Sequence, residues 1–560
     1  MKSLASSKCA GGLLVAFAMA SISLMTACGS SNNIVTPNQG GFGDGNLSGT
    51  YVISISGWDI NSSSDEVPFA IAGTIVANGT GGIESGTLDI NDPGNLGVDI
   101  GESVGSTSSY QIGKDGRGTG TLVTTVGSFN IDFVMTTSSH GLISRFDNLG
   151  TGSGTIDVQA ATPSITGSYA FSLAGTHFVE NAQGNPLGTV GAFGVNGNSI
   201  GGIEDFNDDA SSNDLTGLAL SGQLAVGASG APSTATLTTS FGSLGFDVWV
   251  IDSTHLKFIE TDTDESLILL AGDAFTQVTS LAPGQLVFVL SGMASGGDPV
   301  SVGGYATTDA NGNLTNGFED YNDAGTVGLA KPFSTSAAGC VAGRCELTLA
   351  GFINGEANVT GFVVYPSSGG GQALEIDSLG LLQGASFSQS ATAFTGSGGY
   401  GLNFSGLNNV SQPGIVNDIA QFDAGAPDTS FTGTPTPNMT GVLDENDLAD
   451  LRPSSTMSGV YVPDSPVDGR GTIEATNTNT ELGGFTLQYY VVDPSTVVFI
   501  DVDSLANDGG EAQLGVGTFE GQNSAAGGAA QKAAAQKASA QSHAVIVHPV
   551  IRARGAFQRK

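Results

Sequence analysis

The chain has 560 residues, of which 85 are glycine and only 12% are charged, and its formal net charge is −36. This length predicts several domains, and an apolar content of 39% excludes a disordered chain. The glycines follow no period of three, which excludes collagen, and the acidic balance predicts no nucleic-acid binding because that requires a basic surface.

The N-terminus predicts export and a lipid anchor. A basic start precedes an apolar run over 11–24, and small residues then lead into Cys28. This order is typical of a signal peptide, predicted over 1–27, and the run is shorter than the roughly 20 residues that cross a bilayer. The cysteine after small residues resembles a bacterial lipobox, which implies that Cys28 is acylated; an ordinary secretory signal is the alternative. Residues 28–46 are expected to form a flexible tether, and by analogy with lipoproteins the absence of an aspartate after Cys28 favours the outer membrane or cell surface.

A repeat dominates the rest of the chain. Its opening stretch reads Gly-Thr-Tyr-Val-Ile-Ser-Ile-Ser-Gly at 49–57 and returns in similar form at 167–175, 284–292 and 398–406. Apolar residues alternate there with small or polar ones, which is the pattern of a half-buried strand. We therefore predict four β units, at 47–160, 165–278, 281–389 and 396–522.

Each unit repeats one order of hairpins and turns, and it closes with glycine followed five residues later by glutamine. These closing pairs are Gly154/Gln159, Gly272/Gln277, Gly384/Gln389 and Gly517/Gln522. About seven or eight strands in sequential hairpins predict an antiparallel meander barrel of about 115 residues, because closure removes exposed strand edges. A β-sandwich is the alternative.

An acidic motif, Asp-x-Asn-Asp, occurs once in each unit. Carboxylate and amide oxygens at this spacing suit calcium, which is the one cofactor that the sequence suggests. The favoured interpretation is instead a set of Asx turns, in which these side chains bind nearby backbone amides. The candidate residues are Asp89, Asn91, Asp92, Asp205, Asn207, Asp208, Asp320, Asn322, Asp323, Asp444, Asn446 and Asp447.

No motif predicts catalysis, so we expect a protein that is not an enzyme. A second acidic set comprises Glu260/Asp262, Glu375/Asp377 and Asp501/Asp503, with Arg145/Asp147 in the first unit. Residues two apart share one face of a strand, which suits a rim, a turn or cation ligands better than opposed acid and base roles. Two Gly-x-Ser-x-Gly matches, at 101–105 and 197–201, lack the strand-to-helix context of a nucleophile elbow.

Cys340 and Cys345 flank a four-residue hairpin loop. In an oxidising compartment such a pair is expected to form a disulfide. Zinc binding is the alternative, although two thiols without a nearby histidine make a poor site.

The tail, 523–560, is rich in alanine and carries basic residues but no acid. Alanine favours helix, yet an uncapped lone segment is marginal. We predict a mostly disordered tail, with docking on the acidic body as the alternative.

The lipobox, the Gly-Tyr-x-Phe repeats, the Asp-Gly-Arg-Gly turns at 115–118 and 468–471 and the closing glutamines resemble uncharacterised repeat lipoproteins of environmental bacteria. The resemblance implies the cellular location and the repeats but no activity. We therefore expect a monomeric, lipid-anchored surface protein that acts as a binding or spacer module. Its expected partners are the membrane, through its lipid, and a glycan or surface protein. The alternatives are a lipocalin-like carrier of small apolar ligands and, less favoured, a hydrolase.

Overall fold

The computed structural model describes residues 41–523, apart from 179–183, 209–212, 264–267, 295–296, 354–358, 395–397, 409–413, 428–436, 449, 465–467, 478–483 and 506–511. The described residues belong to one compact unit. The predicted signal peptide, Cys28, most of the tether and all of the tail after Asn523 lie outside them.

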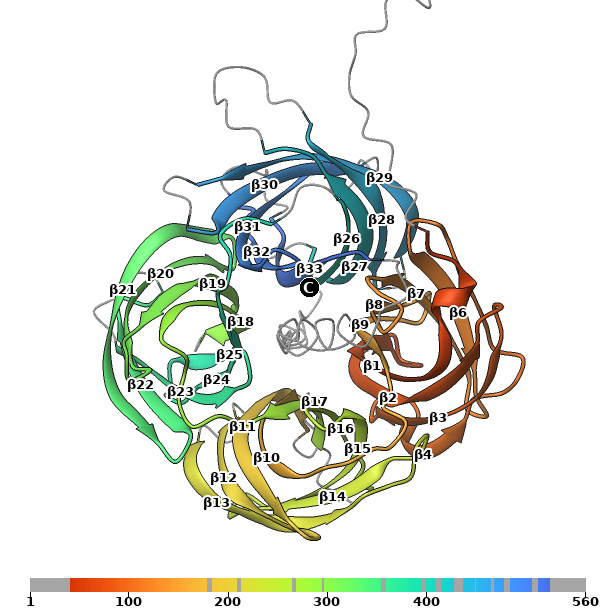
Figure 1. The fold of residues 1–560 in the computed structure, drawn as a ribbon, viewed down its shortest axis with the longest axis horizontal. Helices are drawn as coiled ribbons and strands as arrows, with labels where there is room; N and C mark the ends of the chain where they lie inside the picture. Colours follow the sequence, from red (N-terminus) through yellow and green to blue (C-terminus); the bar gives the residue numbers. More distant parts are fainter. Residues whose placement is uncertain are drawn as a thin grey trace, which may run out of the picture. The chain divides into compact units, whose positions relative to one another are not determined.

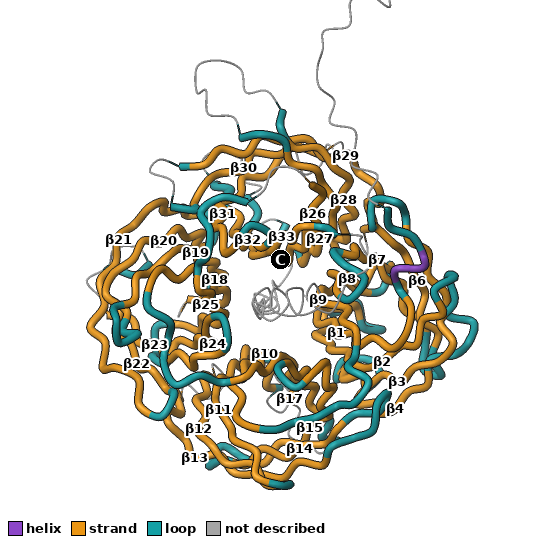
Figure 2. Tube along the Cα trace, in the orientation of Figure 1, coloured by secondary structure: helices purple, strands orange, loops and turns teal. Residues whose placement is uncertain are grey.

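Strands make up most of the described chain (Figure 2). Its one helical element is a 3-10 turn, η1, at Asp44–Asn46. No helix in the described part of the chain has the length and hydrophobicity to cross a membrane.

Three closed antiparallel barrels of eight strands follow one another, and each closes by pairing its first strand with its last. Barrel 2 comprises β10 (Gly167–His177), β11 (Asn185–Asn196), β12 (Ser199–Asp208), β13 (Asn213–Ala225), β14 (Ser233–Thr238), β15 (Ser243–Asp252), β16 (His255–Glu260) and β17 (Ile268–Thr276). Barrel 3 comprises β18 (Gly284–Ala294), β19 (Pro299–Thr308), β20 (Leu314–Asp323), β21 (Thr326–Val341), β22 (Arg344–Ala350), β23 (Val359–Ser367), β24 (Gly370–Glu375) and β25 (Gly380–Ser388). Barrel 4 comprises β26 (Gly398–Leu407), β27 (Ile415–Ala424), β28 (Met439–Asp447), β29 (Asp450–Pro463), β30 (Arg470–Asn477), β31 (Gly484–Asp493), β32 (Thr496–Asp501) and β33 (Leu514–Gly521).

Barrel 1 has nine strands because one strand position is divided in two. Its strands are β1 (Ser48–Ile60), β2 (Glu66–Asn78), β3 (Ile83–Asp92), β4 (Gly97–Ser103), β5 (Ser109–Ile112), β6 (Arg117–Val123), β7 (Ser128–Met135), β8 (His140–Asp147) and β9 (Gly150–Val158). Strand β4 pairs with β3, whereas β5 pairs with β6. An isolated bridge between Gly82 and Ser109 joins β5 to the start of β3, so the two short strands together close the barrel.

Alternation along each strand explains why these residues form barrels. In β10, Tyr169, Phe171 and Leu173 point into the core of barrel 2. Between them, Ala170 points outward and packs against residues of barrel 3. The predicted all-β fold of four tandem meander barrels is confirmed, and the sandwich alternative is not adopted. Figure 1 shows the four barrels in chain order, coloured from red to blue.

Apolar clusters join each barrel to the next, and a further cluster joins barrel 4 to barrel 1. The largest joins barrels 3 and 4 and includes Val287, Phe387, Tyr490 and Ile500. The corresponding members are Val52 and Trp249 for barrels 1 and 2, Ala170 and Tyr365 for barrels 2 and 3, and Ile419 and Val134 for barrels 4 and 1. The contacts between barrels therefore close a cycle.

Candidate functional site

Each Asp-x-Asn-Asp motif ends the third strand of its barrel, β3, β12, β20 or β28. The strand pairing shifts by one residue around the first aspartate in all four cases, which defines a β-bulge. The first aspartate and the asparagine are buried in all four copies. The motif is therefore a buried strand end, and some of its side chains accept nearby backbone N–H groups, from Asn95 to Asp92 and from Gly325 to Asn322. The interpretation as a set of Asx turns stays a prediction.

The first aspartate of each motif fixes the bulge within its own barrel. Its carboxylate accepts a backbone N–H from the following strand, at 2.6–2.8 Å in every copy. The four donors have a positive φ and are Gly101 (+73°), Gly217 (+63°), Ala330 (+50°) and Ser454 (+57°). Each aspartate thus holds a left-handed backbone position that is strained for a residue other than glycine.

The same aspartates also bind the next barrel. Between barrels 2 and 3, Arg344 donates two hydrogen bonds to Asp205, at 2.7 and 2.9 Å, and the Tyr365 hydroxyl donates a third. The same arrangement joins barrels 3 and 4, through Asp320, Arg470 and Tyr490. A bidentate arginine–carboxylate pair is strong and geometrically specific.

The remaining two junctions keep the aspartate but change its partner. Arg117 of barrel 1 donates to Asp444 of barrel 4 at 3.1 Å. Between barrels 1 and 2, none of the described arginines contacts Asp89, and the indole Nε1 of Trp249 donates to it at 2.8 Å. Arg117 and Arg470 belong to the Asp-Gly-Arg-Gly turns. These turns therefore also supply the arginine that binds the aspartate of another barrel.

The asparagine of each motif caps a hairpin of the next barrel. Its amide donates to backbone carbonyls at the end of that hairpin. The acceptors are Glu260 O for Asn91, Glu375 O and Gly380 O for Asn207, Asp501 O, Asp503 O and Gln513 O for Asn322, and Arg145 O, Asp147 O and Gly150 O for Asn446, all at 2.8–3.3 Å.

The last aspartate of the motif has a partner within its own barrel in barrels 1, 2 and 4. Asp92 accepts the backbone N–H of Asn95 at 3.2 Å. Asp208 pairs with His177 at 3.1 Å, and Asp447 accepts from Asn408 at 2.6 Å. Asp323 has a partner as well. In barrels 1, 2 and 4 the three polar residues of the motif therefore bind three different places.

The second acidic set lies on the hairpins that these asparagines cap. Its second members accept a backbone N–H within their own barrel, from Gly245 to Asp262, from Gly361 to Asp377 and from Thr486 to Asp503. In barrel 1 the corresponding Arg145 pairs with Asp59 and Asp147 instead. Members of the set thus hold the hairpins on which they lie.

The closing glutamine and its successor also bind the next barrel. Gln389 donates to Asp468 O and Val491 O of barrel 4, at 3.0 and 2.8 Å, and Gln522 does the same to Asp115 O and Met135 O of barrel 1. The next residue donates its backbone N–H across every junction, from Ala160 to Ile251, Val278 to Pro366, Ser390 to Val492 and Asn523 to Thr136, at 2.7–3.1 Å. The end of barrel 4 thus binds barrel 1 as each barrel binds its successor.

A buried ion network strengthens the junction between barrels 4 and 1. His140 Nδ1 lies 2.7 Å from Asp157, and Nε2 lies 3.0 Å from Glu520 of barrel 4. Burial alone would lower the pKa of His140, but the charges of Glu520 and Asp157 outweigh it and raise the pKa to about 10. His140 is therefore an imidazolium at neutral pH.

The residues of the motif do not converge on a cation. Both carboxylate oxygens of Asp205 and of Asp320 accept hydrogen bonds from protein donors. No group of three or more His, Cys, Asp or Glu in the described part of the chain has the geometry of a metal site. Calcium binding stays a prediction, to be decided by chelation.

The candidates for nucleophilic catalysis lie in hairpins and strands. Residues 101–105 begin in β4, and 197–201 cover the turn between β11 and β12 and the start of β12, so neither match precedes a helix. His255 and His177 pair with Asp273 and Asp208. These histidines therefore have structural partners.

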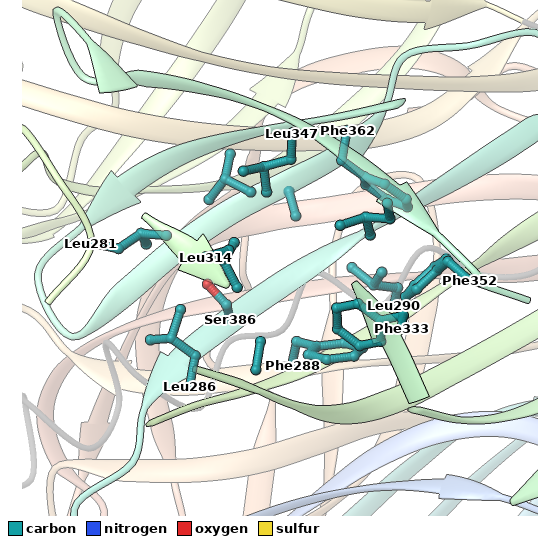
Figure 3. A pocket seen from close by; sticks show the side chains of 14 residues that line it. Leu281, Leu286, Phe288, Leu290, Leu314, Phe333, Leu347, Phe352, Phe362 and Ser386 are labelled. Atoms are coloured by element: carbon teal, nitrogen blue, oxygen red, sulfur yellow. The ribbon is translucent and has the colours of Figure 1, made fainter. Parts of the chain in front are cut away.

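Barrel 3 contains the disulfide between Cys340 and Cys345, which join across the β21–β22 hairpin. Its interior also holds an apolar cavity of about 60 Å³. Figure 3 shows Phe288, Phe333 and Phe352 gathered at one end of the cavity, with Phe362 further along the wall. Pockets for drug-sized ligands measure about 300–1,000 Å³, so this one is too small for such a ligand.

No family model and no curated protein matches the chain. Among solved structures it is similar to a double mutant of transferrin binding protein B from Haemophilus parasuis Hp5, at 10% identity and a TM-score of 0.18, covering 70% of this chain and 82% of that one. A putative AttH from Nitrosomonas europaea shows 8% identity and a TM-score of 0.16, covering 60% and 91%. The fold assignment rests on the strand pairing of this chain itself.

Proposed function

We propose that the protein is a lipid-anchored, non-enzymatic module of the bacterial cell surface that presents four β-barrels as one rigid scaffold for binding or spacing. The observation that carries this proposal is the repeated junction. The most regular polar residues of the sequence, which could have served as ligands or catalysts, bind neighbouring barrels. Because all four junctions use equivalent positions, no single unit is set apart by its motif as a reaction centre.

The proposed anchor is Cys28, at the end of the apolar run. Metabolic labelling with a palmitate analogue should tag the wild-type protein but not Cys28→Ser. Protease added to intact cells should then degrade the barrels of the cell-associated wild-type protein. It should find no barrels anchored on cells that make Cys28→Ser. The proposed location would be contradicted if the variant retained the label, or if the barrels on wild-type cells were protected from protease.

The binding role is tested with the purified full chain on panels of glycans and surface proteins, alongside activity-based probes for hydrolases. Specific binding without probe labelling supports the module. Covalent labelling by a hydrolase probe would contradict it and support the enzymatic alternative. The carrier alternative has one specific observation, the barrel 3 cavity, whose 60 Å³ would hold only a ligand of a few heavy atoms.

A further inference from the structure

A polar groove of about 420 Å³ lies on the outside of barrel 1, over β5, β6 and β7. Strand pairing arranges its side chains in two rows. One row is Gln111, Thr119 and Asp132, and the other is Ser109, Thr121 and Asn130. These residues face outward because their neighbours on β7, Phe129, Ile131 and Phe133, belong to the core.

Asp132 is the unusual member of this groove. Its residue is 7% exposed, and it lines the groove. No hydrogen bond or ion pair to its carboxylate exists among the described residues. The carboxyl therefore opens into the groove without a protein partner, which leaves its oxygens available to hydrogen-bond a ligand there.

At the matching positions of barrels 2 and 4, the polar side chain forms a hydrogen bond with another group of the protein. In barrel 2 the row is Ala225, Thr234 and Asp247, and Asp247 shares a hydrogen bond with Asp89. In barrel 4 the corresponding Gln488 donates to Gly471 O at 2.7 Å. The open carboxyl of barrel 1 is therefore not a general feature of the repeat.

The chemistry of the groove selects the ligand class. Its outward side chains are hydroxyls, amides and one carboxyl, with no apolar anchor of the kind that dominates protein interfaces. One carboxylate is also too few for a divalent cation, which takes six or more oxygen ligands. Cross-strand neighbours lie about 5 Å apart and alternate residues about 7 Å apart, so the two rows cover the scale of one or two sugar rings.

We infer that this groove binds a neutral glycan, with Asp132, Gln111 and Asn130 hydrogen-bonding adjacent sugar hydroxyls. Sugar hydroxyls both donate and accept, and so do the amides and hydroxyls of the two rows. Burial and the charge of Asp444 raise the pKa of Asp132 to about 7, against the opposing effect of Arg117. The carboxyl is thus able to accept or donate near neutral pH. The inference rests on the proposed binding function and names one ligand class for it.

The test uses the full chain on an array of neutral oligosaccharides, namely glucans, mannans, galactans and chitin oligomers, with acidic glycans as comparison. Titration calorimetry then measures each hit. We expect Asp132→Ala and Gln111→Ala each to weaken binding at least tenfold. The matched control is Gln223→Ala, an exposed glutamine on β13 of barrel 2, which should leave affinity unchanged.

Thermal unfolding checks the fold of each variant. Asp132→Ala should melt no lower than wild type, because it removes an unpaired buried carboxyl. A silent array, or glycan binding that survives both groove variants, would overturn the groove. Loss of a protein partner instead of a glycan in these variants would overturn the ligand class. In each of these cases the proposed scaffold function is judged separately, by the surface-protein panel and the hydrolase probes.

Discussion

The junction between barrels 2 and 3 offers the sharpest test of the role given to the acidic motif. Asp205→Asn keeps the shape of the side chain and an acceptor for the Gly217 N–H, but removes the charge that Arg344 binds at 2.7 and 2.9 Å. The Arg344 side chain is 14% exposed and that of Asp205 is fully buried. The substitution therefore leaves a largely buried guanidinium without its main partner.

Breaking a buried ion pair costs about 3–5 kcal/mol. Arg344 retains Glu346 at 2.8 Å, but the side chain of Glu346 is 56% exposed. That remaining pair is worth about 1 kcal/mol at most, so we expect a loss of about 3 kcal/mol. For a barrel of about 110 residues this corresponds to a fall in Tm of about 12 °C.

Urea unfolding followed by tryptophan fluorescence measures the loss, since Trp249 is fully buried in barrel 2. The control is Glu346→Gln, on the exposed arm of the same arginine, which should change stability by less than about 1 kcal/mol. The double variant with Arg344→Met should recover part of the loss, because no charge is then left buried. If Asp205→Asn unfolds within about 0.5 kcal/mol of wild type, the junction does not depend on this pair.

Three further predictions follow from other junction contacts. Because the pKa of His140 is raised in the folded protein, its contribution to stability is fully present below about pH 6.5, the unfolded pKa, and is lost as pH rises towards about 10. His140→Gln should flatten this pH dependence of the melting temperature. A profile unchanged by the substitution would contradict the prediction. Gly469 has a φ of +91°, and a β-carbon there would lie 2.4 Å from Gln389 Nε2. Gly469→Ala should therefore destabilise the junction by about 1–3 kcal/mol. The control Gly127→Ala, whose β-carbon would meet open space, should not destabilise the protein. Since junction donors occupy the motif carboxylates, a calcium chelator should leave Tm unchanged, and a fall of several degrees would instead support the calcium hypothesis.

The sequence was sufficient to predict the repeat and the barrels, because alternation and closing glutamines recur at fixed spacing. It was not sufficient to assign the acidic motif. The local sequence around Asp320 and Asn322 fits metal ligands as well as it fits residues that bind a neighbouring barrel. The role of Asp320 depends on its partner Arg470, which lies 150 positions away in the sequence. The Asp-Gly-Arg-Gly turns are visible in the sequence, but nothing within them shows that their arginine contacts an aspartate of another barrel.

The scarcity of basic residues was the signal that could have found this contact. Outside the N-terminal segment and the tail the chain has eight lysines and arginines, and Arg117, Arg344 and Arg470 each meet the first aspartate of a motif. A cation that recurs in a strongly acidic body at the same place in a repeat predicts a fixed partner. Asp132 could not be found in this way, because only the burial of its neighbours distinguishes it from other strand acids.

The central claim is that barrel 4 binds barrel 1 and closes the cycle of junctions. Its most direct measurement is the distance between spin labels at two exposed positions, Ser128 of barrel 1 and Thr476 of barrel 4, in the full chain. A single narrow distance distribution is predicted, broadening when Asn446→Ala and Glu520→Ala remove two contacts of this junction. A broad distribution in the wild-type protein, as expected of four barrels joined only by their linkers, would contradict the account.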